Sequence, residues 1–148
     1  MSNYEQLKLE NQLCFPIYAA SRLVTQLYTP LLKKLDITYP QYLILLVLWE
    51  YKSLSVTEIG EKLLLETNTL TPLLQRMEAK GILLRIKSES DERRKIIELT
   101  KYGLQMEKIA CQIPVELAKS VSKGFSVERA MRLKEDLKLL IESLTRDN

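Results

Sequence analysis

The sequence predicts a mainly α-helical protein with one small β-hairpin, that is, an α+β fold. Helix-forming residues dominate the 148 residues, which include only four Gly and five Pro. The spacing of apolar residues is helical along most of the chain and changes to a strand pattern after Ile82. Capping and turn residues separate these segments, and 46% hydrophobic residues are enough for one core.

Two helices are expected in the first third of the chain. Apolar and small residues from Leu13 to Leu31 recur on one helical face, and Pro16 either kinks this helix or marks its first turn. Pro40 suits the first position of a second helix, which runs to about Tyr51. Because this second segment is apolar nearly all round, we expect it to be the buried centre of the domain.

Two shorter helices should follow. Ser55–Glu58 is a capping box that begins a helix ending near Leu65. The next helix is expected to begin at about Thr67 or Asn68 and to stop at Gly81, which suits a helix C-terminus. Two short helices around a tight turn form a helix-turn-helix.

A hairpin is expected directly after the helix-turn-helix. Residues 82–87 and 95–99 are β-prone runs, and they flank the charged tip 88–94. A hairpin in this place is a wing, so the centre of the chain is predicted to be a winged helix-turn-helix.

Two further helices are predicted at the C-terminal end. Thr100 should cap a long helix that is interrupted near Pro114 and ended by Gly124. Ser126 should cap the last helix, which carries an apolar stripe. This stripe needs a partner surface, which the opposite chain end or a second subunit could supply.

These elements are expected to form a single domain over residues 1–148. The winged helix-turn-helix would span about 40–100. Terminal helices at about 5–35 and 101–146 would flank it and serve in dimerisation.

Composition excludes several classes of protein. The chain has no histidine and two cysteines, which excludes His-dependent catalytic triads and makes a Cys/His zinc site or a disulfide scaffold improbable. We therefore expect no metal and no cofactor. No run of about 18 apolar residues and no secretory signal is visible, so we expect no membrane contact and a cytoplasmic protein.

The positive charge is concentrated in one segment. Between Arg76 and Lys95 there are seven basic and four acidic residues, and this surplus of three equals the net charge of +3 of the whole chain. A concentrated basic segment can bind phosphates even when the net charge is small. The alternative is an ordinary solvated face.

The second helix of the motif and the hairpin supply the candidate residues for double-stranded DNA. Hydroxyl and amide side chains at a helix start can bond phosphates or base edges, and an arginine at a wing tip can enter the minor groove. The alternative is that the Thr and Asn residues are only caps and the arginines only solvated. The candidates are Thr67, Asn68, Thr69, Thr71, Gln75, Arg76, Lys87, Arg93 and Arg94.

Two motifs resemble the MarR family of winged-helix regulators, and the resemblance covers almost the entire chain. Asp91–Arg94 followed by Leu99–Gly103 is similar to the wing signature of that family, and Gly60–Leu63 through Thr69–Leu74 is similar to its DNA-binding helices. The resemblance implies a dimer that binds a pseudo-palindromic operator.

A narrower resemblance is to the organic hydroperoxide regulators of this family. Their Leu-Cys-Phe motif matches Leu13–Phe15, and their tyrosines match Tyr18, Tyr28 and Tyr39. The resemblance implies that Cys14 is the peroxide sensor and that the tyrosines hydrogen-bond its sulfur. Without these matches a lone cysteine would be interpreted as a small buried hydrophobic residue.

Helix geometry adds a condition on these tyrosines. Tyr18 is one turn from Cys14 and can lie beside its sulfur. Tyr28 is about 21 Å further along the same helix, so it can serve Cys14 only from another subunit. Cys111 precedes the position of the resolving cysteine in related proteins, and we expect it to be a packing residue, with a resolving role as the alternative.

The favoured hypothesis is therefore a homodimeric repressor that organic hydroperoxide releases from its operator. With one reactive cysteine, a small thiol would complete the reaction as a mixed disulfide. The alternatives are a regulator released by a small aromatic ligand, with Cys14 not functional, and a thiol peroxidase. The lack of histidine and of a clear resolving cysteine argues against the enzyme.

Overall fold

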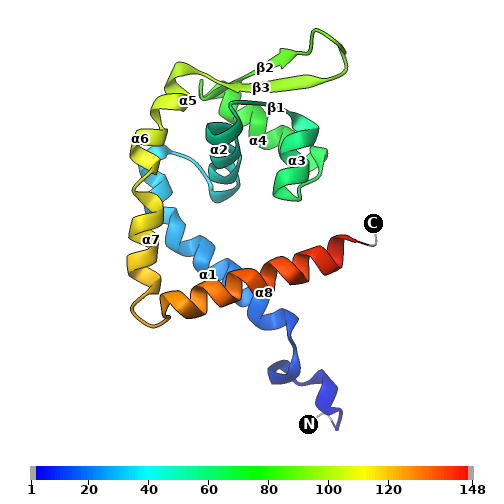
Figure 1. The fold of residues 1–148 in the computed structure, drawn as a ribbon, viewed down its shortest axis with the longest axis vertical. Helices are drawn as coiled ribbons and strands as arrows, with labels where there is room; N and C mark the ends of the chain where they lie inside the picture. The colour runs from blue at the N-terminus through cyan, green and yellow to red at the C-terminus, as the bar shows by residue number, and fades with distance from the viewer. Residues whose placement is uncertain (1–2, 147–148) are drawn as a thin grey trace. The chain divides into compact units, whose positions relative to one another are not determined.

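The computed structural model describes residues 3–146, which form two compact units that meet between Ile113 and Pro114 in the chain, 3–113 and 114–146. Elements of the first unit are drawn in Figure 1 from blue to yellow. In chain order the elements are η1 (Glu5–Leu7), η2 (Leu9–Asn11), α1 (Cys14–Leu32), η3 (Lys33–Leu35), α2 (Tyr39–Tyr51), β1 (Ser53–Ser55), α3 (Val56–Leu63), α4 (Thr67–Ala79), β2 (Leu83–Lys87), β3 (Lys95–Leu99), α5 (Lys101–Gln105), α6 (Glu107–Ala110), α7 (Ile113–Val121) and α8 (Val127–Thr145).

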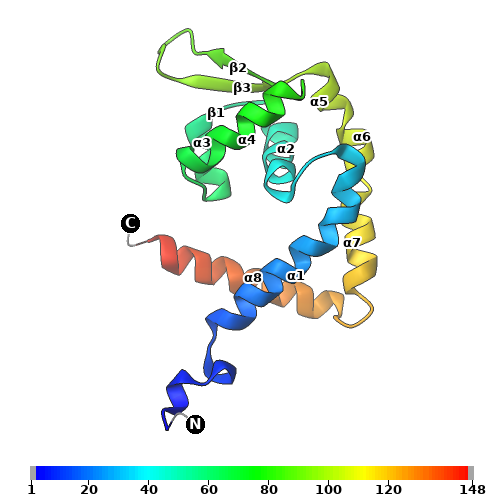
Figure 2. The same cartoon turned by 180° about the vertical axis from the view of Figure 1, so that it is seen from behind.

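The sheet of the first unit has three antiparallel strands in the order β1-β3-β2. The predicted hairpin is confirmed as β2 and β3, with Leu83 opposite Leu99 and Lys87 opposite Lys95. Strand β1 was not predicted, and it pairs with β3 through Leu54 opposite Ile97. In Figures 1 and 2 the helices α2, α3 and α4 lie below this sheet, and the hairpin extends beyond them.

The core of the first unit lies between α2, α3, α4 and the sheet. Helix α2 is its centre, as its apolar sequence predicts, with Ile44, Leu45 and Leu48 fully buried. Leu70, Leu74 and Met77 of α4 recur at helical spacing and pack from the opposite side. Burying these faces orients α4 so that its remaining face lies toward solvent.

Side-chain caps begin the helices where the sequence predicts them. Ser55 N donates to Glu58 Oε2 at 2.7 Å and Glu58 N donates to Ser55 Oγ at 3.2 Å, which is a complete capping box. Gly103 N donates to Thr100 Oγ1 at 3.1 Å, and Arg129 N donates to Ser126 Oγ at 3.3 Å. Pro16 lies in the first turn of α1, so the second of its two predicted placements holds.

The end of α4, the base of the hairpin and the start of α5 meet at one joint. Gly81 has a φ of +72° and ends α4, and Thr100 Oγ1 donates toward the carbonyl oxygens of Gly81 (2.6 Å) and Ile82 (3.0 Å). A Cβ at Gly103 would lie 2.2 Å from the Ile82 oxygen, so only glycine fits there. Trp49 Nε1 donates to the Gly103 oxygen at 3.0 Å and ties the joint to α2.

The long helix expected after Thr100 is divided into α5, α6 and α7, with breaks at Met106 and at Cys111–Gln112. The second break precedes Pro114, because proline has no N–H for the carbonyl four residues earlier and its ring crowds the preceding turn. The chain resumes as α7 with Pro114 in its first turn, where the missing donor costs little.

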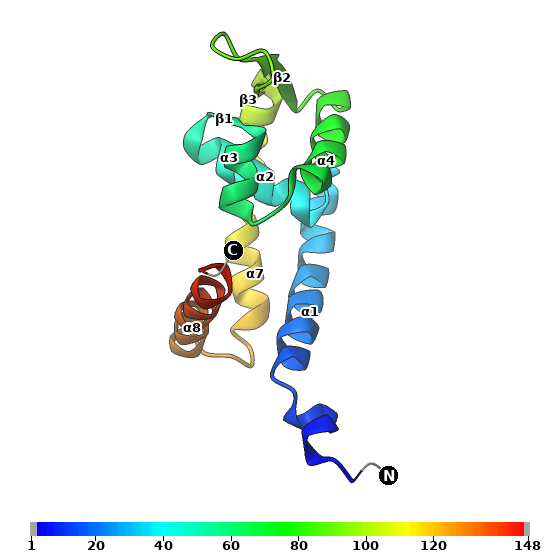
Figure 3. The same ribbon diagram turned by 90° about the vertical axis from the view of Figure 1, so that its right-hand side faces the viewer.

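The second unit consists of most of α7 and all of α8, joined by a short turn that Figure 3 shows from the side. Helix α8 buries none of its side chains within the described chain. An apolar groove of about 260 Å³ is lined by Val121, Phe125, Val127 and Met131, among others. Between residues 3 and 146, no helix combines the length and the apolar character needed to cross a membrane.

Candidate nucleic-acid interface and thiol site

The first residues of α4 present their polar side chains to solvent. The helix begins at Thr67, as expected, and Thr67, Asn68 and Thr69 are exposed. About two turns further on, Gln75 and Arg76 are exposed as well. Burial of the apolar face of α4 therefore leaves five of the six predicted α4 residues accessible.

The sixth predicted residue of α4 has an intrahelical role. Thr71 is half-buried, and its hydroxyl donates to the Thr67 oxygen at 2.8 Å. This bond fixes the rotamer of Thr71, which lines the hollow described next.

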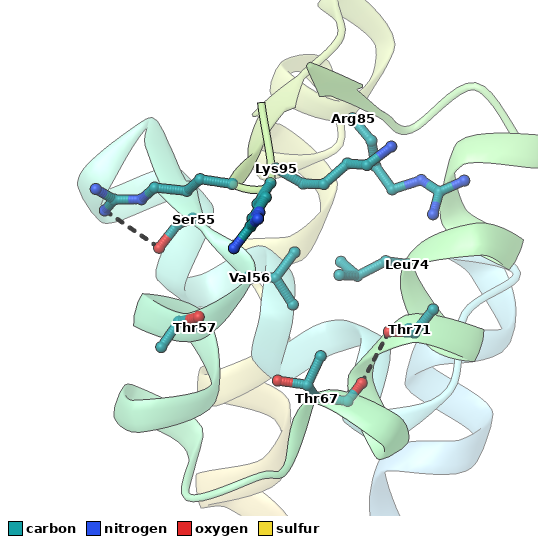
Figure 4. Close-up of a pocket in the computed structure, with 10 residues that line it drawn as sticks. Ser55, Val56, Thr57, Thr67, Thr71, Leu74, Arg85 and Lys95 are labelled. Atoms are coloured by element: carbon teal, nitrogen blue, oxygen red, sulfur yellow. Dashed lines mark hydrogen bonds between the residues drawn. The ribbon is translucent and has the colours of Figure 1, made fainter. Parts of the chain in front are cut away.

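A hollow of about 270 Å³ lies between the two helices of the motif and the hairpin. Thr67 and Thr71 line it from α4, Thr57 from α3, and Arg85 and Lys95 from the hairpin, as Figure 4 shows. Arg93 and Arg94 also contribute to its wall. The structure thus brings the first turns of α4 and the basic hairpin together, although even Thr71 and Arg85 are 14 positions apart in the chain.

The hairpin adds cations that the sequence analysis did not single out. Lys95 stands directly opposite the predicted residue Lys87, and both are exposed. Like charges in this position destabilise a bare hairpin, so the pair favours an anionic partner. Arg85 lies on β2 two residues before Lys87, and this strand period is the signal that could have identified it.

Arg85 and Arg94 are held by carboxylates of the helix-turn-helix. Arg85 Nη2 is 2.8 Å from Glu78 Oε2, and Arg94 Nη2 is 3.1 Å from Glu58 Oε1. The hydrogen bond from Arg85 lowers the pKa of Glu78. The backbone bond from Ser55, and then the Arg94 charge, lower the pKa of Glu58. Both carboxylates therefore stay ionised opposite their arginines.

Arg93 differs from Arg94 in its contacts. Its backbone N–H donates to Asp91 Oδ1 at 3.0 Å, which orders the tip of the hairpin. Its side chain is exposed and forms no ion pair within residues 3–146. Of the two adjacent arginines, Arg93 is thus the one that is available to a ligand.

The predicted sensor thiol is accessible. Cys14 is the first residue of α1, and it is free and exposed. Tyr18, one turn further on, is also exposed, and the Arg22 guanidinium lies 5.8 Å from the centre of its ring. Cys14 and Tyr18 therefore face solvent in the single chain.

Three tyrosines form a cluster at the other end of α1. The ring centres of Tyr28 and Tyr39 are 4.7 Å apart, and Tyr42 lies 5.7 Å from Tyr28. Burial, followed by the neighbouring phenols, raises the pKa of Tyr28 to about 12. The structure brings Tyr28 and Tyr39 together but leaves Tyr28 about 21 Å along α1 from Cys14. Tyr42 was not predicted as a member, although it belongs to the same Tyr-Pro-Gln-Tyr motif.

Cys111 does not pack in the core, contrary to expectation. It is exposed between α6 and α7, and its thiol donates to the Lys108 oxygen at 3.1 Å. Met106, Ala110 and Ile113 form the buried stripe at helical spacing, and Cys111 lies off this stripe. In the described part of the chain, no group of acidic or cysteine side chains is arranged to hold a metal ion.

The known proteins that are similar to this chain are transcriptional regulators. The family model of the transcriptional regulators SarA/Rot matches residues 26–110. An organic hydroperoxide resistance transcriptional regulator of Bacillus subtilis is 48% identical over 147 residues, which is 99% of each chain.

Solved structures of AbfR, a protein of Staphylococcus epidermidis, have the same fold. Reduced AbfR bound to DNA is 38% identical with a TM-score of 0.77, and the match covers 95% of this chain and 98% of that one. A disulfide form of AbfR is 42% identical with a TM-score of 0.67, over 93% and 95% of the two chains. The same architecture thus occurs bound to DNA and in more than one thiol oxidation state.

Proposed function

The chain belongs to the SarA/Rot and MarR group of winged-helix transcriptional regulators, among the organic hydroperoxide resistance regulators, and from this premise we propose that it is a peroxide-responsive repressor. A homodimer binds a pseudo-palindromic operator, and oxidation of Cys14 by an organic hydroperoxide releases it. One observation carries the proposal: a free, exposed thiol at Cys14 in a chain 48% identical, along its whole length, to such a regulator. Its site of action is the cytoplasm, where bacterial DNA is.

The exposed face of α4 is the part proposed to enter the major groove. Thr67, Asn68 and Thr69 would meet base edges or phosphates at the helix start, and Gln75 suits adenine. Arg76 would hold the DNA backbone, and the Lys87 side chain would meet phosphates beside the hairpin. Arg93 is the candidate for the minor groove, because it is exposed and unpaired in the described structure.

Exposed apolar side chains support the dimer. In the single chain, α1 exposes Leu23, Val24 and Leu27, and α8 exposes Leu139 and Ile141. Residues 5–35 and 101–146 would then be dimerisation segments around a winged helix-turn-helix at 40–100. A second subunit would also allow its Tyr28 and Tyr39 to approach Cys14 and Tyr18, which no movement within one helix permits.

The chemistry requires one oxidant and one thiol. The Cys14 thiolate attacks the terminal peroxide oxygen, an S–O bond forms, the O–O bond breaks, and the alkoxide leaves and takes a proton to become the alcohol. The sulfur is now a sulfenic acid. A low-molecular-weight thiol then displaces water from it and leaves a mixed disulfide on Cys14.

Operator binding before and after oxidation tests this function. We expect cumene hydroperoxide to release the reduced wild-type protein from its operator, as measured by fluorescence anisotropy, and intact mass to show one modification per chain. Cys14→Ser should stay bound under the same treatment. Cys111→Ser is the matched control and should be released like the wild type. Equal release of the Cys14→Ser variant would exclude the redox mechanism.

A cavity of about 480 Å³ favours a second candidate, release by a small aromatic ligand. It is lined by Thr25, Thr29 and Leu32 of α1, and by Tyr39 and Lys80. Apolar walls with a few polar groups are typical of small-molecule sites. Release of the operator by a phenolic carboxylate, equally in the wild type and in Cys14→Ser, would establish this alternative.

A further inference from the structure

The Arg94 side chain is half-exposed and pairs with the first turn of α3. Its Nη2 atom lies 3.1 Å from Glu58 Oε1 and donates to Ser55 Oγ at 3.4 Å, the bond drawn to Ser55 in Figure 4. The other Glu58 oxygen accepts the Ser55 N–H at 2.7 Å. One carboxylate therefore caps α3 with one oxygen and holds the hairpin with the other.

The backbone of Arg94 closes the hairpin tip. Its carbonyl accepts from Ser88 N at 2.9 Å, and its N–H donates to the Asp91 oxygen at 3.0 Å. Holding the Arg94 side chain on α3 therefore also fixes the turn that carries Arg93. A second ion pair, Arg85 with Glu78, anchors β2 to α4 on the other side.

We propose that Arg94 is a positioning residue for DNA binding: through Glu58 and Ser55 it fixes the hairpin against α3 and so presents Arg93 to the minor groove. This inference rests on the proposed function, and it separates two adjacent arginines that the sequence alone assigns to one role. Arg93 contacts DNA, and Arg94 acts through Arg93.

The two roles predict opposite effects of removing the Glu58 charge. If Arg94 contacted DNA, Glu58→Gln would free a cation and strengthen binding. If Arg94 positions the hairpin, the same variant loosens it and weakens binding. Glu61 provides the matched control, because it lies on the same helix, is exposed and forms no ion pair in the described chain. Glu61→Gln reports the long-range charge effect alone.

The test begins with a DNA duplex that the reduced wild-type protein selects from a random pool. We expect Arg94→Ala and Glu58→Gln each to weaken binding up to about fivefold relative to Glu61→Gln, the upper range for a half-exposed ion pair. Arg94→Ala should lower the slope of log K against log salt by less than Arg93→Ala does, because Arg93 keeps its charge and is only less well placed. Arg93→Ala should lower that slope by about one phosphate equivalent.

Double variants and a flank substitution separate positioning from loss of folded protein. In the Arg93→Ala background, adding Arg94→Ala should cost nothing further. Exchanging the A·T pairs at the wing contact for G·C should lower the affinity of the wild type by a larger factor than it lowers the affinity of the Arg94→Ala variant. A loss of active protein would instead leave the ratio of the affinities for the two duplexes the same in both proteins. Thermal unfolding measured by circular dichroism shows whether each variant is folded. If Arg94→Ala is unfolded, Glu58→Gln carries the test in its place.

Three results would overturn the inference: tighter binding by Glu58→Gln than by Glu61→Gln, equal binding by the two, or a salt slope that Arg94→Ala reduces as much as Arg93→Ala does. Failure of the wild type to select any duplex would instead overturn the proposed function. The two failures are therefore distinguishable.

Discussion

The segment from α2 to β3 and the helices α1 and α8 use their apolar residues in opposite ways. The first segment buries Ile44, Leu48 and Leu70 completely within one chain. Helix α1 buries only Leu32 of its described residues, and α8 buries none, although both carry apolar residues at helical spacing. Hydrophobic periodicity thus shows that a face will be covered, and the structure shows whether the same chain covers it. Substitutions in the two regions should therefore differ in whether they affect the stability of one chain or the association of two.

The largest effect is expected at the joint below the hairpin. Gly103→Ala places a methyl group 2.2 Å from the Ile82 oxygen, so backbone must move in a close-packed region. We expect a loss of about 4 kcal/mol in the free energy of unfolding, measured with urea.

Gly124→Ala is the control for this substitution. A Cβ at Gly124 would meet no heavy atom of the described residues within 4 Å, and its φ is not left-handed, so the change should be close to neutral. Equal losses in the two variants would show that the joint is no more tightly packed than the turn between α7 and α8.

A smaller effect is expected on the exposed apolar face of α8. Ile141→Asp should raise the dimer dissociation constant about 100-fold, close to 3 kcal/mol, because a carboxylate would be buried against a second subunit. Sedimentation equilibrium measures it. Arg132→Asp lies on the opposite side of the helix, at 100° per residue, and should leave the dimer intact. An unchanged dimer in Ile141→Asp would show that this face is not at the interface.

The smallest effect concerns the tyrosines where α1 meets α2. The pKa of Tyr28 is raised to about 12, so the folded state holds this proton more tightly than the unfolded state does. The resulting stability is complete below pH 10, the ordinary tyrosine value, and is lost as the pH rises through 12. We expect about 1 kcal/mol between pH 9 and 11.5 after solvent screening.

Urea unfolding at the two pH values measures this loss. Tyr28→Phe should reduce the pH dependence, because phenylalanine cannot ionise, and the part that remains comes from Tyr39 and Tyr42, whose pKa values burial also raises. Tyr102→Phe, at an exposed position, should leave the dependence as in the wild type. If Tyr28→Phe retains the full loss, another group is responsible.

Sequence reasoning was most successful where the contacts are local. The helix starts after Ser55, Thr100 and Ser126 follow from bonds between residues three apart, and such bonds are visible as a spacing. The start of α4 and both hairpin strands were placed to within one residue for the same reason.

Contacts between distant residues could not be predicted in this way. Strand β1 has three residues and no period, and it exists because it pairs with β3 more than 40 residues later. Arg93 and Arg94 have the same local chemistry, and only the approach of α3 to the hairpin distinguishes them. The roles of Cys14 and Tyr18 stay predictions, because a second subunit would complete their surroundings.

The joint formed by Gly81, Ile82 and Thr100 has a mechanical consequence. The end of α4, the base of the hairpin and the start of α5 are bonded to one another here and to Trp49, so the joint is rigid and is not a hinge. A displacement of α5 would therefore rotate α4 and the hairpin together as one rigid body. Oxidation of a distant thiol would then leave each DNA-binding unit intact. It would change the distance between the two units of the dimer, which would no longer match the distance between the half-sites on the DNA.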